Sequence, residues 1–506
     1  MLRLNLRIFS YRLHNHCAAV FRNVHVVVLS LFMVVVTANA VFSSGAAFNN
    51  QLETIVGREL APDFAITIQV ADLQTGRVLM EKNPDLPLVP ASTMKIATSA
   101  AALSVLKPDF VFVTEVLADQ AKDSSVGNLY VKGYGDPYLV SEELFTLARS
   151  VRERGLKEVR GNIVVDDSYF APDPPLDENE KIGTRAYHAP YGALSLNFNS
   201  VKVLVRPANR SGNPADVTLD PISEYADVKA AVMTTKGNKP AQFDVTKEAT
   251  PGKTEIIQLE GTIGVNAPSK SRYVNVNIPS LYTGEVFREF LLREGIKIKG
   301  RVIQGKVSPN AISYVEYGNS RALSAMIYGL NKFSNNFMAE QISLALGANV
   351  FGPPGTREKG LSVIRKHLLS CGVPENSFSL SEASGLSRNN RVSASALVRV
   401  LSGAAKDFTY NSEFMSSFGV AGVDGTLKEK FTDSTVRRRI RAKTGNLRGV
   451  NALAGYALAQ DGRVLVFAAI VNSNNKGAGF IDYGEKIVRA VMDTNFGTRS
   501  NEVSGN

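Results

Sequence analysis

The segment Pro90-Ala91-Ser92-Thr93-Met94-Lys95, with the Ala- and Leu-rich run that follows it to Leu106, is the most informative stretch of the chain. The run predicts a buried helix with Ser92 at its N-terminal end. Ser92 and Lys95 are three residues apart, so they share one face of this helix. A serine hydroxyl is a poor nucleophile without a base, and a buried lysine beside other cations can lose its proton near neutral pH. The pattern alone also fits an N-cap serine followed by a surface lysine.

Two further motifs give this pattern its meaning. Ser334-Asn335-Asn336 interrupts an apolar helical run expected over residues 321–347, where polar side chains are costly unless they have partners. Lys443-Thr444-Gly445 ends an expected strand, where the glycine would let a ligand backbone approach closely. Each alone also fits an ordinary helix–helix loop or an edge strand with a turn. In this order, S-x-x-K, S-x-N and K-T-G supply a serine acyl-transfer site that needs no histidine.

Histidine and cysteine use argues against other chemistries. The chain has five histidines and two cysteines, and most of them precede residue 41. Only His188, His367 and Cys371 lie beyond it, none in a nucleophile or metal-ligand motif. We therefore expect no Ser-His-Asp triad, no metal and no cofactor, and we expect Cys371 to be a small buried apolar residue.

The N-terminus has the pattern of a secretory signal. Four arginines without an acidic residue precede an apolar run from Val26 to Val36, and Ala38-Asn39-Ala40 offers a cleavage site. The run is shorter than the roughly 20 residues that a membrane-spanning helix needs, although an uncleaved anchor is the alternative. We expect a signal peptide over residues 1–40 and a periplasmic mature protein.

The net charge of +10 falls to +6 without the four leader arginines. The remaining basic residues are scattered, which together with the export signal argues against a nucleic-acid partner. A modest basic excess favours peripheral association with an anionic wall polymer or a membrane surface.

The pattern of strands predicts an interrupted domain. Alternating runs such as Ala65–Val70 and Val464–Val471 lie near the two ends of the chain and imply one sheet built from both. Between about residues 112 and 305, short strands separated by turns predict a mostly β insertion of about 200 residues, beyond the size of one typical domain. We therefore expect the insertion to hold two subdomains.

The three motifs, with this insertion between the first two, resemble those of the three-domain, low-molecular-mass (class C) penicillin-binding proteins. These form the D-alanyl-D-alanine carboxypeptidase/endopeptidase family of peptidase clan SE. The resemblance covers nearly all of the expected mature chain and extends to Gly135-Asp136-Pro137, Ser384-Gly385-Leu386-Ser387-Arg388 and Gly422-Val423-Asp424-Gly425-Thr426-Leu427.

The resemblance implies a mixed α/β fold of the penicillin-recognising serine transferase and β-lactamase type. An antiparallel sheet flanked by helices would form the catalytic domain, and the insertion would be mostly β. The implied units are a signal peptide (1–40), a catalytic domain (41–112 and 311–506), insertion domain II (113–205 and 277–310) and insertion domain III (206–276).

The resemblance also implies the catalytic roles. Ser92 would attack the D-Ala-D-Ala carbonyl while Lys95 takes its proton. Ser334 would relay a proton to the leaving D-alanine, and Lys443 would polarise the cluster. Asn336 would bond to Lys95 and to the substrate amide.

A second group of residues would bind the substrate. Thr444 would bind its terminal carboxylate beside Gly445, and the backbone N–H groups of Ser92 and Asn446 would form an oxyanion hole. Arg388 and Arg448 could bind a second carboxylate, such as that of meso-diaminopimelate. The insertion would contribute Asp166 and Phe170.

The expected function is a serine-type D-Ala-D-Ala carboxypeptidase, with DD-endopeptidase activity as well. Its substrates would be peptidoglycan stem peptides and muropeptides, and β-lactam antibiotics would inhibit it. The alternatives are a β-lactamase-related hydrolase, which would usually be smaller and lack the insertion, and a non-catalytic wall-binding protein, which would not need the full motif set. The balance of the two peptidase activities, the third stem residue and the oligomeric state stay open.

Overall fold

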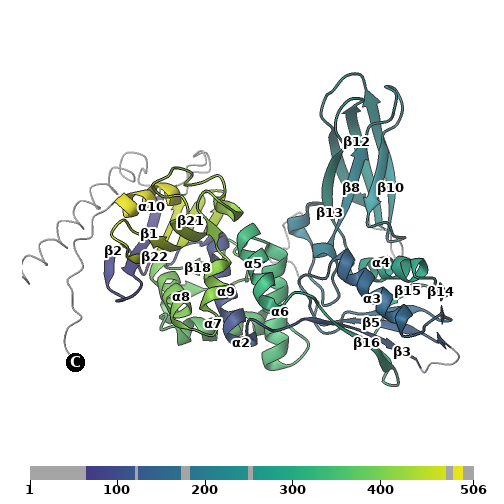
Figure 1. The fold of residues 1–506 in the computed structure, drawn as a ribbon, viewed down its shortest axis with the longest axis horizontal. Helices are drawn as coiled ribbons and strands as arrows, with labels where there is room; N and C mark the ends of the chain where they lie inside the picture. The colour runs from purple at the N-terminus through teal and green to yellow at the C-terminus, as the bar shows by residue number, and fades with distance from the viewer. Residues whose placement is uncertain (1–63, 120–123, 173–182, 249–254, 474–482, 494–506) are drawn as a thin grey trace, which may run out of the picture.

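The computed structural model describes residues 64–119, 124–172, 183–248, 255–473 and 483–493. The expected signal peptide lies outside them. Figure 1 shows an elongated molecule with three parts, which we call the core lobe (residues 64–112 and 319–493), the base (113–199 and 276–318) and the upright lobe (200–275). The upright lobe rises from the base, at the end of the molecule away from the sheet of the core lobe.

A six-stranded antiparallel sheet organises the core lobe, in the order β19-β20-β21-β22-β1-β2. β1 and β22 pair along their length, with Thr67 opposite Ile470, so the two ends of the chain build one sheet as predicted. The strands are β1 (Phe64–Asp72), β2 (Val78–Lys82), β19 (Gly419–Val420), β20 (Ile440–Leu447), β21 (Val450–Leu458) and β22 (Val464–Ser473).

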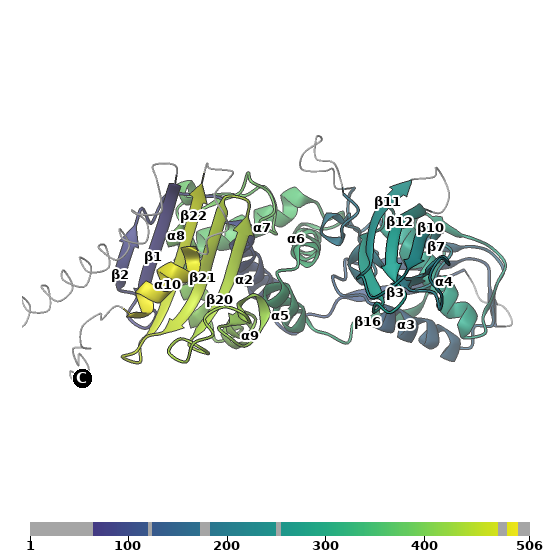
Figure 2. The same ribbon diagram turned by 90° about the horizontal axis from the view of Figure 1, so that it is seen from above.

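Both faces of this sheet are covered. In β22, Val466, Ala468 and Ile470 pack against the main helical layer, whereas Phe467 and Ala469 pack on the side of α10. Figure 2 shows α10 on one side of the sheet and the other helices behind it. The predicted antiparallel sheet flanked by helices is confirmed. The longer helices are α2 (Lys95–Leu106), α5 (Leu323–Phe333), α6 (Asn336–Phe351), α7 (Arg357–Ser370), α8 (Ala394–Lys406) and α10 (Tyr483–Asp493), with α9 (Asn411–Ser416) beside them.

The predicted interruption of the long helical run at the second motif is also present. α5 ends at Phe333, and Ser334, which follows it, has a left-handed backbone with φ of 56°. The side chain of Asn335 then caps α6 by accepting a bond of 3.1 Å from the N–H of Met338. The two helices therefore meet at a sharp corner that carries the motif.

The base contains a five-stranded sheet in the order β15-β7-β5-β3-β16 and a three-stranded sheet in the order β14-β6-β4. It also holds two helices, α3 (Ser141–Glu153) and α4 (Pro279–Arg293), which the expectation of a mostly β insertion did not include. The strands are β3 (Val113–Ala118), β4 (Ser125–Val126), β5 (Leu129–Gly133), β6 (Glu158–Val159), β7 (Ile163–Asp166), β14 (Lys297–Ile298), β15 (Val302–Gln304) and β16 (Ile312–Gly318).

The upright lobe consists of two three-stranded sheets, β10-β12-β11 and β13-β8-β9. Its apolar side chains continue without a break into those of the base, since Val203 and Val274 belong to the same core as Tyr282 of α4. Its strands are β8 (Ser200–Arg206), β9 (Asp216–Asp220), β10 (Ala226–Thr235), β11 (Gln242–Glu248), β12 (Glu255–Gly264) and β13 (Lys270–Asn275).

Two predicted boundaries need correction. β16 (Ile312–Gly318) pairs with β3, so the insertion runs past residue 310, where domain II was expected to end. β8 (Ser200–Arg206) pairs with β13 and β9, so the upright lobe begins before residue 206. Both shifts have one cause: a strand belongs to the sheet that satisfies its backbone hydrogen bonds, and sequence pattern does not name its partner.

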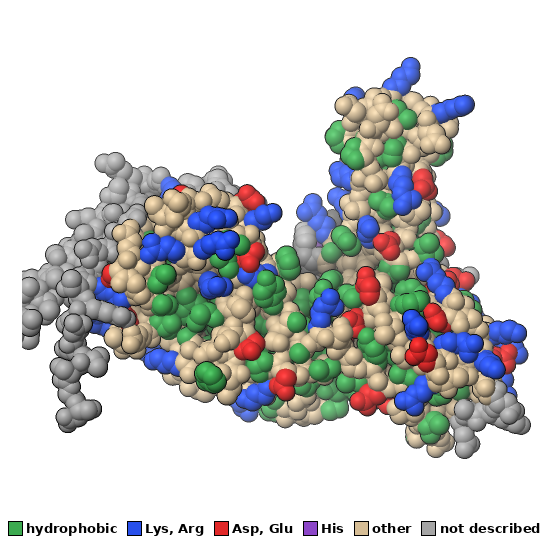
Figure 3. Space-filling model, in the orientation of Figure 1, with side chains coloured by type: hydrophobic (Ala, Val, Ile, Leu, Met, Phe, Trp, Pro, Cys, Tyr) green, Lys and Arg blue, Asp and Glu red, His purple; other side chains and the backbone are tan. Residues whose placement is uncertain are grey.

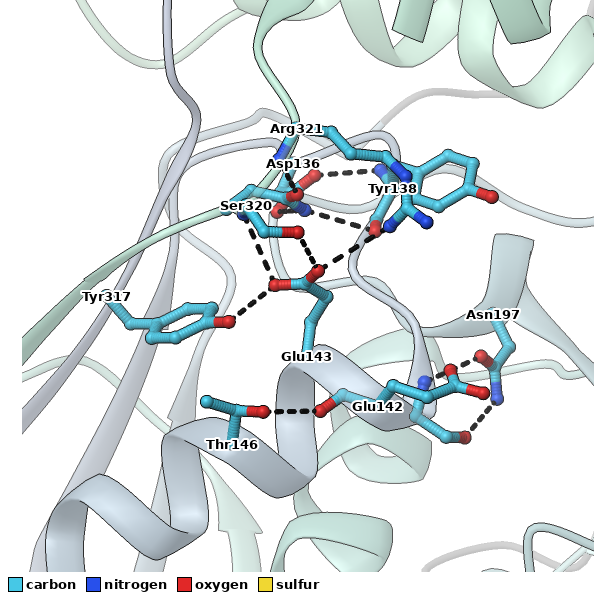
Figure 4. A network of polar contacts seen from close by, with 11 residues as sticks. Asp136, Tyr138, Glu142, Glu143, Thr146, Asn197, Tyr317, Ser320 and Arg321 are labelled. Carbon is cyan, nitrogen blue, oxygen red and sulfur yellow. Dashed lines mark hydrogen bonds and ion pairs between the residues drawn. The ribbon is translucent and has the colours of Figure 1, made fainter. Parts of the chain in front are cut away.

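A polar joint holds the chain where it returns from the base to the core lobe (Figure 4). The amide of Asn319 donates to Asp136 at 2.7 Å, which gives the Gly-Asp-Pro segment a structural role. The buried carboxylate of Glu143, on α3, accepts hydrogen bonds from Tyr317 and Ser320 and lies 3.5 Å from the guanidinium of Arg321. These contacts connect α3 of the base to the segment that leads into α5.

Candidate active site

Ser92 lies in a short 3₁₀ turn, η1 (Ala91–Met94), directly before α2. The turn is held tightly from two sides. Ala91 has a φ of 47°, and a Cβ placed on Gly385 would lie 1.9 Å from the Ala91 carbonyl oxygen. A Cβ on Gly445 would lie 2.6 Å from the carbonyl oxygen of Pro90. Only glycine permits these approaches, so both glycines clamp the turn that carries the serine.

Lys95 is fully buried on the first turn of α2. Its Nζ lies 3.0 Å from Ser92 Oγ and 2.7 Å from Asn336 Oδ1, and it also donates to the carbonyl of Ser384. Burial lowers the pKa of Lys95 to about 8, although the charges of Glu382 and Glu340 act in the opposite direction. The amine can therefore accept the Ser92 proton near neutral pH.

Lys443, in the third motif, forms a hydrogen bond with Ser334 in the second motif. Its Nζ, also fully buried, donates to Ser334 Oγ and to the carbonyl of Thr444, each at 2.9 Å. Burial, and then the charge of Lys95, lower the pKa of Lys443 well below its usual range. Ser92, Ser334 and Lys443, though far apart in sequence, thus belong to one connected cluster.

The substrate-binding candidates at the end of β20 differ in exposure. Thr444 is buried and its hydroxyl donates to Thr426 Oγ1 at 2.9 Å. Asn446 is exposed, and its Oδ1 accepts from the amide of Asn451 at 2.8 Å. Gly445 packs against the backbone of the Ser92 turn, as described above. This contact within the protein requires a glycine, whereas the sequence suggested that the glycine admits a ligand backbone.

The four remaining candidates separate into two pairs. Arg388 and Arg448 are both exposed, and the guanidinium of Arg388 donates to the carbonyl of Arg448, so the structure brings these two together. Asp166 and Phe170 are buried within the protein. The Asp166 carboxylate accepts from the N–H groups of Ser168 and Val307, and the ring of Phe170 packs beside Gly135 and Gly355. Their contacts are thus internal to the base and its junction with the core lobe.

Sequence reasoning missed a buried acidic pair behind Lys95. Glu340, on α6, accepts from the N–H groups of Ala383 and Ser384 at 3.0 and 2.7 Å. Glu382 lies beside it and is 1% exposed. The signal available in the sequence was a single acidic residue, Glu340, inside the mostly apolar run of α6.

The Gly-Val-Asp-Gly-Thr-Leu segment also gains a physical role. Asp424 forms an ion pair with Lys332, whose Nζ lies 2.6 Å from Asp424 Oδ1 and whose side chain is 3% exposed. Thr426 accepts the bond from Thr444. This one segment therefore contacts the end of α5, next to Ser334, and the third motif on β20.

A cavity of about 590 Å³ lies beside the second motif, between the core lobe and the insertion. Ser334 and Asn336 form part of its wall. Figure 3 shows an open recess between the upright lobe and the core lobe on the face drawn, with Lys and Arg side chains gathered on the core lobe. The insertion contributes residues that include Ser141, Asn197, Lys202 and Tyr273.

The described residues hold no group of three or more His, Cys, Asp or Glu side chains that could bind a metal ion. Cys371 is partly buried and its Sγ lies 3.7 Å from His367 Nε2, but burial raises the pKa of the thiol and lowers that of the imidazole to about 4. Across the same described ranges, no helix is long and apolar enough to cross a membrane.

Comparison with known proteins identifies relatives along most of the chain. The sequence profile of the D-Ala-D-Ala carboxypeptidase 3 (S13) family matches residues 49–489. A D-alanyl-D-alanine carboxypeptidase of Actinomadura sp. (strain R39) is 33% identical over 429 residues, which are 81% of this chain and 78% of that protein. D-alanyl-D-alanine carboxypeptidase DacB of Haemophilus influenzae is 25% identical and covers 80% of this chain and 85% of its own length.

The solved structures agree with the fold. The crystal structure of penicillin binding protein 4 from Haemophilus influenzae superposes with a TM-score of 0.73, at 22% identity, over 87% of this chain and 97% of that one. A second crystal structure of the same protein, complexed with a β-lactam, gives a TM-score of 0.69. The match extends over nearly the whole of the relative, so the insertion and the core lobe are shared together.

Proposed function

The chain belongs to the D-Ala-D-Ala carboxypeptidase 3 (S13) family, and from that membership we propose how its own residues carry out the serine carboxypeptidase reaction. Lys95 removes the proton of Ser92, and Ser92 Oγ attacks the carbonyl carbon between the two D-alanines. The new bond joins Oγ to that carbon. The C–N bond then breaks, and the leaving D-alanine receives a proton through Ser334, which Lys443 holds at 2.9 Å.

Water completes the reaction by attacking the same carbonyl carbon of the acyl-enzyme, which restores the Ser92 hydroxyl. We assign the oxyanion hole to the backbone N–H groups of Ser92 and Asn446. The close packing of Gly445 on the Ser92 turn supports this, because it holds the two segments side by side. Thr444 would bind the terminal carboxylate.

The observation that carries the proposal is the environment of Lys95. Its Nζ is within hydrogen-bond distance of Ser92 and of Asn336, and its pKa of about 8 leaves part of it neutral at physiological pH. A wall-binding protein without catalysis would have no use for a buried lysine held against a serine at a cost in desolvation. A β-lactam, which presents a similar acyl group, would acylate the same Ser92 and inhibit the enzyme.

We further propose DD-endopeptidase activity on cross-linked muropeptides. The cavity of about 590 Å³ beside Ser334 and Asn336 supports it, because a second stem peptide needs room between the core lobe and the insertion. Arg388 and Arg448 sit next to each other at the surface and would bind a free carboxylate on the third stem residue. Asp166 and Phe170 would act by shaping the junction, since both are buried.

We propose that the protein is exported to the periplasm through a cleavable signal peptide. The basic and apolar pattern of residues 1–40 supports export, and a peptidoglycan substrate requires it. Association with the wall or the membrane surface would follow from the basic excess of the mature chain.

Purified protein incubated with defined monomeric and cross-linked muropeptides tests the function directly. We expect mass spectrometry to find release of terminal D-alanine and cleavage of cross-links. Ser92→Ala should abolish both, together with covalent labelling by a fluorescent penicillin, while the circular dichroism spectrum stays that of the unmodified protein. Slow release of bound penicillin distinguishes this enzyme from a β-lactamase, which would turn the antibiotic over. Labelling that persists in Ser92→Ala would overturn the assignment of the nucleophile.

A further inference from the structure

Two carboxyl groups are buried together directly behind Lys95, outside the residues that the reaction itself needs. Glu340 projects from α6, one helical turn after Asn336, and is 5% exposed. Glu382 begins the segment that leads to Gly385 and is 1% exposed. The N–H of Ser384 donates to both carboxyl groups, at 2.7 Å to Glu340 Oε1 and 2.9 Å to Glu382 Oε2, so the two groups lie side by side.

Two buried carboxyl groups that accept from the same N–H are too close for both to be ionised. Two negative charges at this separation would repel each other strongly, and two carboxylates, which only accept hydrogen bonds, could not bond to each other. The shared donor and the burial therefore indicate that one of the two is a neutral acid.

The number of donors decides which one is charged. Glu382 accepts from the backbone N–H groups of Gly385 and Ser387, from both the N–H and the hydroxyl of Ser384, and from the amide of Asn390. Within the part of the chain that the structure describes, Glu340 accepts from two backbone N–H groups. A carboxylate is stabilised by the bonds it accepts, so the charge belongs on Glu382 and the proton on Glu340.

Ser384 connects this charge to the general base. Its N–H and hydroxyl face Glu382, while its carbonyl accepts a hydrogen bond from Lys95 Nζ. The charged groups that act on Lys95 are thus the acidic pair on one side and Lys443 on the other. The segment from Glu382 to Asn390 is also the one whose Gly385 clamps the Ser92 turn.

We propose that Glu340 and Glu382 share a single proton, held by Glu340, and that the remaining charge on Glu382 anchors the Ser384 segment which positions Lys95 against Ser92. Both are positioning residues and neither touches the substrate. The inference rests on the proposed role of Lys95 as general base. The pKa shifts of the two carboxyl groups agree with this assignment. Burial raises the pKa of Glu340. Burial also acts to raise the pKa of Glu382, but its hydrogen bonds have the larger effect and lower that pKa.

The first test measures the proton without measuring catalysis. Glutamate labelled with ¹³C in the carboxyl group would be incorporated into the full-length Ser92→Ala protein, and its infrared spectrum recorded at neutral pH. All variants would also carry Glu285→Gln, because burial raises the pKa of Glu285 to about 7 and would add a second band. We expect the carbonyl stretch of a buried protonated acid, and we expect Glu340→Gln to remove it. Glu358→Gln, at an exposed position on α7, should leave it in place. Absence of the band, or its survival in Glu340→Gln, would overturn the shared proton even if the enzyme is active.

The second test measures positioning through the rate of penicillin acylation. Glu340→Ala should lower the rate constant by about tenfold or more, because displacement of a catalytic group by about 1 Å has effects of this size. Glu340→Gln should restore most of it, since glutamine reproduces the shape and the donor of the neutral acid. Equal rates in Glu340→Gln and Glu340→Ala would contradict the proposal.

The pH dependence of acylation adds a readout that a merely structural role would not move. Glu382→Gln removes the negative charge that favours protonated Lys95, so the acidic limb of its profile should shift to lower pH by about one unit or more. Glu340→Gln removes no charge and should keep the limb where it is. If the limb shifted as far in Glu340→Gln as in Glu382→Gln, the assignment of the negative charge to Glu382 would be wrong. Should Glu382→Gln fail to fold, the profile of Glu340→Gln and the infrared band still decide the proposal.

Discussion

At the scale of single residues, the chemistry depends on how a lysine is buried. Lys95 has no exposed surface, and its three acceptors are Ser92, Asn336 and the carbonyl of Ser384. Three acceptors satisfy an ammonium group completely, so the surroundings stabilise the charged form while desolvation opposes it. The outcome is a pKa of about 8, which lies close to the working pH and suits a general base.

The pH dependence of acylation follows from this value. If Lys95 is the general base, as proposed, only its neutral amine can accept the serine proton, so the rate constant should rise with pH through about 8 and then level off. Below that pH it should fall about tenfold for each unit, as the fraction of neutral lysine does. Stopped-flow measurement of penicillin acylation between pH 5 and about 10 checks this. Lys95→Arg should be inactive throughout, because arginine stays charged. A flat profile would remove Lys95 from the role of base.

The proposed substrate choice also depends on single side chains. Arg388 and Arg448 meet at the surface, and charge-assisted bonds to a carboxylate contribute about 1.5–3 kcal/mol each before desolvation. We expect stem peptides with a free diaminopimelate carboxylate to be cleaved about tenfold faster than lysine or amidated analogues. Arg388→Ala should remove most of that preference in kcat/KM and affect penicillin acylation less. Arg149→Ala, at an exposed position on α3, is the control. Equal kcat/KM for the free and amidated stems in the unmodified enzyme would contradict this.

At the scale of elements, two glycines with the same backbone φ allow a controlled comparison. Gly385 and Gly462 both have a φ of 84°, but only Gly385 has the Ala91 carbonyl where its Cβ would lie. Gly462→Ala should cost about 1–2 kcal/mol of stability, the usual penalty for a left-handed alanine. Gly385→Ala should cost more and slow acylation, because the Ser92 turn must move. Thermal unfolding and penicillin labelling of the two variants give the measurement, and similar losses in both would refute the clamp.

Sequence patterns predicted the elements that carry strong periodicity and missed those defined by their partners. The strands of residues 65–70 and 464–471 and the break at Ser334 were foreseen, because alternation and a polar interruption are local signals. Helix α3 was missed, although Leu144, Leu147, Ala148 and Val151 follow helical spacing, since the strands around it dominated the pattern. Glu340 and Glu382 were missed because the single acidic residue within α6 is a local signal, whereas its partner is brought beside it only by the fold. The three motifs were found because their residue types and order are rare together.

At the scale of the whole molecule, the boundary between the insertion and the core lobe contains both a cavity and the polar joint that holds the two parts together. The cavity beside Ser334 and Asn336 has walls from both parts, so its shape depends on how the base is held against the core lobe. The polar joint of Figure 4 holds the base in place through Glu143, which is 6% exposed. Its carboxylate accepts hydrogen bonds from Tyr317 and Ser320 and forms an ion pair with Arg321. On the proposed assignment, a small β-lactam would need only the motif cluster, whereas a cross-linked muropeptide would also have to fit the cavity.

Glu143→Ala should therefore separate the two kinds of substrate. Removal of the Glu143 carboxylate leaves the hydroxyls of Tyr317 and Ser320 without this acceptor and should lower the free energy of unfolding by about 2–3 kcal/mol. Penicillin acylation should stay close to that of the unmodified enzyme, while cleavage of a cross-linked muropeptide falls several-fold, because the cavity wall is no longer fixed. Glu153→Ala, at the exposed end of the same helix, is the matched control and should change neither. If Glu143→Ala lowered penicillin acylation and muropeptide cleavage equally, the joint would support the motif cluster itself. The proposal that the joint acts only through the cavity would then be wrong.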